Sequence, residues 1–282
     1  MRKSIIGALN WLAKYAAAAY IAGPGVTDAV RVCRQVAEHG RSTAICPWDG
    51  PHDPQEDVVS SYKVALGAII QEKIDSYLSI KVPSLGYSLT YLTELAEIAR
   101  DHGIRLHFDS LAPETASRSL TLLEQASGIY RNVGYTLPSR WQRSIADAEK
   151  IIELAVPVRV VKGQWPDPAE PDIDAGSNFL NLVDVLAGRA SQVAIATHDA
   201  KLAREALTRL KEAGTVCQLE QLYGLPMRDG LAKSLGIPVR VYIPYGHAYL
   251  SYSLSAIRRR PIIAAWLLKD FLTGIKKRYT DS

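Results

Sequence analysis

A single closed (β/α)₈ barrel with extra helices at both ends is the α/β fold that this sequence predicts, on three observations. Eight short runs rich in β-branched residues alternate with longer stretches of helical period. No internal linker rich in proline, glycine or serine divides this series. The length of 282 residues suits one barrel of about 250 residues with additions. We therefore expect one domain over residues 1–282.

The N-terminal segment 1–40 is expected to be helical. Apolar residues recur at helical spacing from Trp11 to Ala19, which is typical of an amphipathic helix that packs on the body of the protein. Lys14 interrupts the apolar stretch, and no cleavage site made of small residues follows it, so a targeting peptide is the less favoured interpretation. No sequence window reaches the ~18 uncharged apolar residues of a membrane span.

The eight strand candidates have few polar breaks. Runs such as Val-Ala-Ile-Ala favour parallel strands that are covered on both faces. In order along the chain, the candidates are residues 42–46, 77–82, 104–109, 129–137, 157–162, 192–197, 215–219 and 238–243.

Helical candidates lie between the strands. Gly40, Gly103 and Gly214 each follow the last apolar residue of such a stretch, where a left-handed C-cap is needed. The acidic, proline-rich stretch 166–176 is the one long irregular insertion, and residues 250–282 are expected to form C-terminal helices that pack on the barrel. The other candidates span residues 55–76, 89–102, 114–126, 140–154, 179–190 and 200–213.

Composition excludes several classes of protein. Hydrophobic residues make up 48% and charged residues 22% of the chain, as in ordinary soluble globular proteins. The formal charge is only +4, and acidic residues separate the basic ones, so we expect no nucleic-acid partner. Three scattered cysteines are too few for a disulfide framework, which favours a reducing, cytoplasmic compartment.

Polar residues follow the predicted strands at the end where barrel enzymes carry their active sites. Burying lysine and arginine there is costly unless they face anions, so we expect a negatively charged ligand: a cofactor with phosphates or a substrate carboxylate. The residues at these strand ends are Lys81, His107, Asp109, Arg159, Lys162, Gly163, Thr197, His198, Asp199, Glu220, Tyr223, Gly224, Tyr245 and His247.

Four segments in this order resemble the signatures of the proline dehydrogenase family: residues 158–163, 196–199, 220–224 and 239–246. Ser79-Ile80-Lys81 is similar to that family's strand-two motif. The resemblance implies a distorted barrel that holds FAD non-covalently. It also implies hydride transfer from the carbon next to nitrogen of L-proline to flavin N5, which gives pyrroline-5-carboxylate, with electrons passed on to quinone.

The resemblance also implies roles for individual residues. Arg159, near the redox-active edge of the flavin, would be catalytic together with Lys81 and Tyr252. Glu220 would meet the adenosine end of FAD. Contacts to the cofactor would come from Tyr135, Arg159, Lys162, Gly163, Thr197, His198, Glu220 and Tyr245, and contacts to the substrate from Lys81, His107, Tyr245, Tyr252, Arg258 and Arg259.

One motif departs from the family pattern. The arginine pair that would clamp the proline carboxylate is replaced by Ser255-Ala256, and Arg258, Arg259 and Arg260 follow about one helical turn later. Either the helix register shifts so that two of these arginines reach the ligand, or the clamp is lost and the substrate is a different amine. His107 also stands where the family carries aspartate.

Other interpretations stay open. Lys81 or Lys162 could form a Schiff base, as in aldolase barrels, and the barrel could also bind a ligand without redox chemistry. A metal-dependent hydrolase could use His107, Asp109, His198, Asp199 and His247, although we expect no metal. The basic C-terminal segment could rest on an anionic membrane as a peripheral contact and meet quinone there, while a packed helix with a solvated end is favoured.

Overall fold

Eight parallel strands form a closed barrel in the computed structural model, which describes residues 20–50 and 52–246. The predicted fold class is therefore confirmed, and each of the eight predicted strands is present. In chain order the strands are β1 (Ser42–Trp48), β2 (Ser76–Ile80), β3 (Leu106–Phe108), β4 (Val133–Pro138), β5 (Val158–Val161), β6 (Val193–Ala196), β7 (Cys217–Leu222) and β8 (Val239–Gly246).

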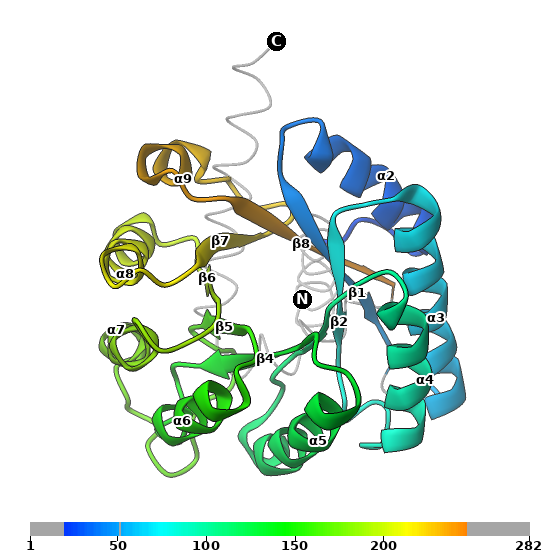
Figure 1. The fold of residues 1–282 in the computed structure, drawn as a ribbon, viewed down its shortest axis with the longest axis horizontal. Coiled ribbons are helices and arrows are strands. Elements are labelled where there is room, and N and C mark those ends of the chain that lie inside the picture. The colour runs from blue at the N-terminus through cyan, green and yellow to red at the C-terminus, as the bar shows by residue number, and fades with distance from the viewer. Residues whose placement is uncertain (1–19, 51, 247–282) are drawn as a thin grey trace, which may run out of the picture.

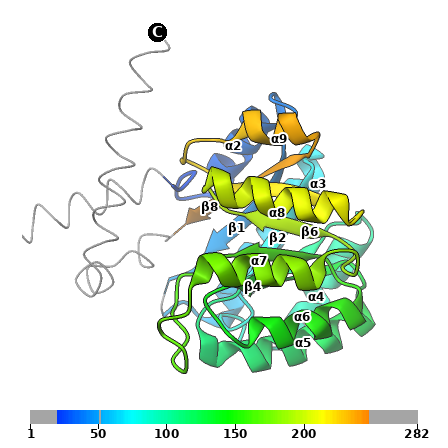
Figure 2. The same cartoon turned by 90° about the vertical axis from the view of Figure 1, so that its left-hand side faces the viewer.

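A ring of helices surrounds the barrel, in the order of the chain from α2 to α9 (Figure 1). Seen from the side, neighbouring helices stack in layers around the sheet (Figure 2). The helices are α2 (Val26–Ala37), α3 (Gln55–Glu72), α4 (Leu89–Arg100), α5 (Ala116–Ile129), α6 (Ser144–Leu154), α7 (Ala175–Leu186), α8 (Ala200–Glu212) and α9 (Asp229–Leu235), with a 3₁₀ turn (Pro113–Thr115) before α5.

Pairing of β1 with β8 closes the barrel. Their parallel register runs from Ser42 opposite Arg240 to Trp48 opposite Gly246, so neither strand is left as an edge. Along each strand, residues face the surrounding helices and the barrel interior in alternation. Ile45 is one of those that face the helices, in the apolar core. Arg159 on β5 bonds to Ser79 on β2, two strands that are not neighbours, which shows that the interior is polar.

The predicted glycine caps are confirmed. Gly40, Gly103 and Gly214 have φ values of +68°, +62° and +71°, in the left-handed region that glycine adopts without steric cost.

Several element boundaries differ from the prediction by a few residues, and one helix was missed. The fourth strand begins at Val133 rather than at residue 129, because Ile129 is the last residue of α5 and Tyr130 caps that helix. The short helix α9 was not among the predicted ones, since seven residues hold too little of a helical period to be recognised.

Several predictions lie outside the described residues. They are the amphipathic helix up to Ala19, the C-terminal helices over 250–282, and the proposed roles of Tyr252, Arg258 and Arg259. Across the described parts of the chain, we find no helix with both the length and the apolar character needed to span a membrane.

Candidate active site at the carboxyl ends of the strands

A cavity of about 420 Å³ opens at the carboxyl ends of the strands. Its size is within the range of small-molecule sites, and its position matches that of active sites in barrel enzymes. It collects side chains from most of the strands and from the loops that follow them. The lining includes Trp48, Lys81, Asp109, Thr136, Arg159, Lys162, Gly163, Thr197, His198, Glu220, Gln221 and Tyr242.

Arg159 lies at the floor of this cavity with only 4% of its side chain exposed. It forms ion pairs with Asp109 on the segment after β3 and, at 2.7 Å, with Glu220 on β7. Burial by itself would lower the pKa of Arg159, but the charges of Glu220 and Asp109 raise it well above its usual value. The guanidinium is therefore a permanent, fixed cation.

Two tyrosines complete the pairing of the carboxylates. Tyr77 donates a 2.5 Å hydrogen bond to Glu220, and Tyr242 donates a 2.8 Å bond to Asp109. The Tyr242 ring also lies 5.1 Å from the Arg159 guanidinium. Burial raises the pKa of both phenols well above the usual value, so they stay protonated and act as donors. This network holds the orientation of Arg159 from several sides.

Lys81 is the second cation of the inner cavity, with 13% of its side chain exposed. Its Nζ donates to Asp49 Oδ1 and to the Pro47 carbonyl, both at 3.1 Å, and lies 5.2 Å from the centre of the Trp48 ring. Ser84 donates a 2.7 Å bond to the other oxygen of Asp49. Asp49 therefore serves as a dedicated counterion of Lys81.

Lys162 and Gly163 form the rim after β5. Lys162 lies 3.3 Å from Asp199, and both side chains are more than 40% exposed, so this pair is weak. Gly163 has a φ of +85°, and a Cβ at this position would meet Pro138 Cβ at 2.7 Å. The turn that presents Lys162 therefore requires glycine.

The loop after β6 holds Thr197 and His198. The Nε2 atom of His198 accepts a 3.0 Å bond from the backbone N–H of Leu222, which places the ring proton on Nδ1, 3.3 Å from the Pro226 carbonyl. The imidazole is thus neutral and held between two loops. Asp199 caps α8 by accepting from the backbone N–H groups of Lys201 and Leu202.

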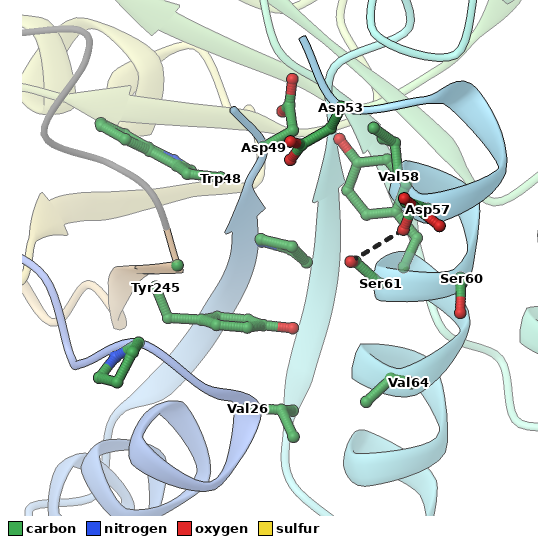
Figure 3. A pocket seen from close by; sticks show the side chains of 14 residues that line it. Val26, Trp48, Asp49, Asp53, Asp57, Val58, Ser60, Ser61, Val64 and Tyr245 are labelled. Atoms are coloured by element: carbon green, nitrogen blue, oxygen red, sulfur yellow. Dashed lines mark hydrogen bonds between the residues drawn. The ribbon is translucent and has the colours of Figure 1, made fainter. Parts of the chain in front are cut away.

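Three residues expected at the site do not line this cavity. Tyr135 points away from the barrel interior, and its hydroxyl lies 3.5 Å from the Ala116 carbonyl among the helices. Tyr245 also faces outward, into a groove beside α3 (Figure 3). His107 points inward but lies one layer below, stacked on Tyr77 at 5.2 Å. Glu220 lines the floor as the partner of Arg159.

Other functional candidates were missed from the sequence: Tyr242, Thr136, Ser79, Asp49 and Gln221. The sequence did offer one signal for such residues, namely polar residues inside the apolar run of β8. A strand buried on both faces tolerates polar residues only where the barrel interior is itself polar. Gln221 lines the cavity, and among the described residues its buried Nε2 has no hydrogen-bond partner. Such a donor suits the polar edge of a ligand.

The groove at Tyr245 is a separate feature of about 450 Å³ between β1 and the helices α2 and α3 (Figure 3). Asp49, Asp53 and Asp57 line one side of it. In the portion of the chain that the structure describes, no group of three acidic, histidine or cysteine side chains could hold a metal ion.

Sequence comparison finds relatives over nearly the whole chain, although no family model matches it. Proline dehydrogenase 1 of Bacillus subtilis subsp. natto is 26% identical over 271 residues, which cover 90% of this chain and 89% of that protein. Proline dehydrogenase 2 of Bacillus subtilis strain 168 is 26% identical over 290 residues, with coverage of 93% and 92%.

Solved structures share the fold. Proline utilization A from Bdellovibrio bacteriovorus, inactivated by N-propargylglycine, superposes with a TM-score of 0.73 at 14% identity over 87% of this chain. The corresponding protein of Corynebacterium freiburgense gives 0.69 at 14% identity over 96%. This chain spans about a third of those longer proteins, 32% and 33%. The chain therefore shares its barrel fold with these structures and is similar to proline dehydrogenases along nine-tenths of its length.

Proposed function

We propose that this protein is an FAD-dependent oxidoreductase that acts on the CH–NH group of a proline-like cyclic secondary amine. The observation that carries the proposal is the buried Arg159 at the cavity floor, in a chain about a quarter identical to proline dehydrogenases. A fixed cation beside a flavin ring stabilises the negative charge of the reduced ring and so favours hydride acceptance.

The residues of the cavity fit a flavin. Arg159 would face the redox-active edge of the ring, Lys162 on the exposed rim would meet the phosphates, and the free amide donor of Gln221 would meet a ring carbonyl. Thr197 and His198 would line the cofactor from the loop after β6. Tyr242, which the structure brings to the cavity in place of Tyr245, would shape the wall next to the substrate.

Bound FAD supplies the hydride acceptor, flavin N5. On the substrate, the C–H bond next to nitrogen breaks and its electron pair leaves with the hydrogen. The nitrogen lone pair then forms the C=N bond, and the N–H proton is released, so the product is an imine; with proline it is pyrroline-5-carboxylate. The task of the chain would be alignment: Lys81 and Tyr242 would position the amine, and Arg159 would hold the flavin ring. We expect a quinone to reoxidise the reduced flavin. We expect the protein to reach that quinone through at most a peripheral contact with the membrane.

Flavin content and flavin bleaching test this proposal. We expect the purified protein to be yellow and to bleach anaerobically when a cyclic secondary amine is added. Arg159→Met should slow bleaching by about 100-fold, whereas Arg189→Met, which removes an exposed arginine, should leave the rate unchanged. A folded protein that takes up no FAD would show the proposal to be wrong.

A further inference from the structure

We propose that the barrel carries a second ligand site, for a doubly charged oxyanion such as phosphate, at the amino ends of the strands. Arg105 immediately precedes β3, and Arg240 is the second residue of β8. Both guanidinium groups lie over the ring of Tyr77, at 5.7 Å and 4.9 Å from its centre. We call these three residues, together with Gln218, the lower arginine site. It lies at the end of the barrel opposite the cavity, and it does not rest on the proposed function.

Neutral groups accept the hydrogen bonds that the two arginines make to described residues. The acceptors are the side chains of Gln192 and Asn132 for Arg105, and the Thr43 carbonyl and the Gln218 side chain for Arg240. Burial lowers the pKa of Arg105, and the nearby charge of Arg240 lowers it further. These acceptors therefore solvate the two guanidinium groups without neutralising their charge.

Asp75 shows that this site attracts an anionic oxygen. Its Oδ1 lies 3.6 Å from Arg240 Nη2, which is longer than a hydrogen bond. The Asp75 side chain is 79% exposed, whereas that of Arg240 is 14% exposed. An ion pair with one partner so exposed is weak, and water can take over the Asp75 carboxylate at little cost. A ligand can therefore replace Asp75 beside Arg240.

Gln218 adds an uncharged donor to the lower arginine site. It is 3% exposed and lies two residues before Glu220 on β7, so its side chain points to the same face, the barrel interior. Its Oε1 accepts a 3.3 Å bond from Arg240, while its buried Nε2 has no hydrogen-bond partner among the described residues. Leaving a buried amide donor without an acceptor is costly, and a ligand oxygen would supply that acceptor.

These donors suit a tetrahedral oxyanion. Each guanidinium is a planar fork that binds two oxygens of one ligand, and two guanidinium groups balance the charge of a dianion. Such an anion has enough oxygens to bond to Arg105, Arg240 and the Gln218 amide together. Free inorganic phosphate and the phosphate group of a small phosphomonoester share this chemistry.

Calorimetric titration of inorganic phosphate into the protein as purified, at constant ionic strength, tests the proposal. We expect saturable binding, which Arg105→Lys should weaken about tenfold because lysine keeps the charge but lacks the fork. Arg100→Lys is the matched control, since Arg100 is an exposed arginine on the last turn of α4, at the same end of the barrel. Absence of saturable binding, or equal weakening in both variants, would overturn the proposal.

Lys162→Met distinguishes the lower arginine site from the cavity. Lys162 is the exposed cation of the cavity rim, so its loss should leave phosphate binding at the other end of the barrel unchanged. Phosphate binding that is lost in Lys162→Met and kept in Arg105→Lys would place the anion at the cavity and contradict the proposal.

Asp75→Asn should strengthen binding, because it removes the competing carboxylate and keeps the shape of the side chain. We expect the dissociation constant of phosphate to fall about threefold, whereas Asp101→Asn, at an exposed position just after α4, should not change it. An unchanged or weaker affinity in Asp75→Asn would refute the proposed place of the anion. Phenyl phosphate then separates the two sources: binding tighter than that of inorganic phosphate identifies a phosphomonoester as the ligand, and weaker binding identifies free phosphate.

Discussion

Arg159 illustrates how single residues hold this site together. Its guanidinium lies in the barrel interior, where an unpaired charge would be very costly, and it is tolerated because Glu220 and Asp109 balance it. Tyr77 and Tyr242 each donate a further hydrogen bond to one of these carboxylates. Arg159 and its counterions therefore form one structural unit.

Neutralising one counterion should be costly. We expect Glu220→Gln to lower the free energy of unfolding by about 3 kcal/mol, because it leaves a buried guanidinium underpaired. The measurement is urea denaturation followed by circular dichroism. Glu149→Gln is the matched control, since Glu149 pairs with Arg189 on the surface at 2.6 Å and should cost less than about 1 kcal/mol. Equal losses in the two variants would contradict the idea that the buried network stabilises the barrel.

Among the elements, the pairing of β8 with β1 leaves no room for a side chain at the last residue of β8. Gly246, at the end of β8, has a φ of +96° and pairs with Trp48. A Cβ there would lie 2.8 Å from the Trp48 carbonyl oxygen, a backbone atom that cannot move without disturbing the seam. Glycine at this position allows the two strands to approach.

Alanine at this seam should be more harmful than alanine at an ordinary glycine cap. We expect Gly246→Ala to cost about 3 kcal/mol, through both backbone strain and the steric clash. Gly40→Ala is the control: its φ of +68° is also left-handed, but nothing lies within 4 Å of the added Cβ, so about 1 kcal/mol is expected. Urea midpoints measure both values, and a Gly246→Ala cost no larger than the control would refute the steric argument.

At the scale of the whole molecule, the polar barrel interior determines the response to acid. His107 lies in this interior, and its pKa is held well below the usual 6.5, first by burial and then by the nearby charges of Arg159, Arg105 and Arg240. The folded protein keeps this ring neutral, whereas the unfolded chain protonates it near pH 6.5. Below that pH the unfolded state binds more protons, so stability falls as the pH falls.

His107→Asn should remove this part of the acid sensitivity. Between about pH 6.5 and 5, we expect the free energy of unfolding of the parent to fall more steeply than that of the variant, by up to about 1.4 kcal/mol per pH unit. Chemical denaturation at several pH values gives both slopes. His102→Asn, at an exposed position after α4, should keep the parental slope. A variant slope equal to that of the parent would mean that His107 does not control acid stability.

The sequence by itself determined the barrel and the end of it that carries the site. Periodicity is a local property, so eight strands and three glycine caps could be predicted from runs of residues. Arg159, Lys81 and Lys162 could likewise be placed at the cavity, because the end of a strand is visible in the chain.

Only the tertiary structure decided which side chains face the cavity and how their charges are paired. Tyr242 lines the site and Tyr245 does not. The two residues are an odd number of positions apart on β8, so their side chains point to opposite faces of the strand. His107 lies a layer too deep, and Glu220 is a counterion of Arg159. Closure of the barrel brings β2, β5 and β7 to one centre, and no local pattern in the sequence specifies distances between strands that are so far apart along the chain.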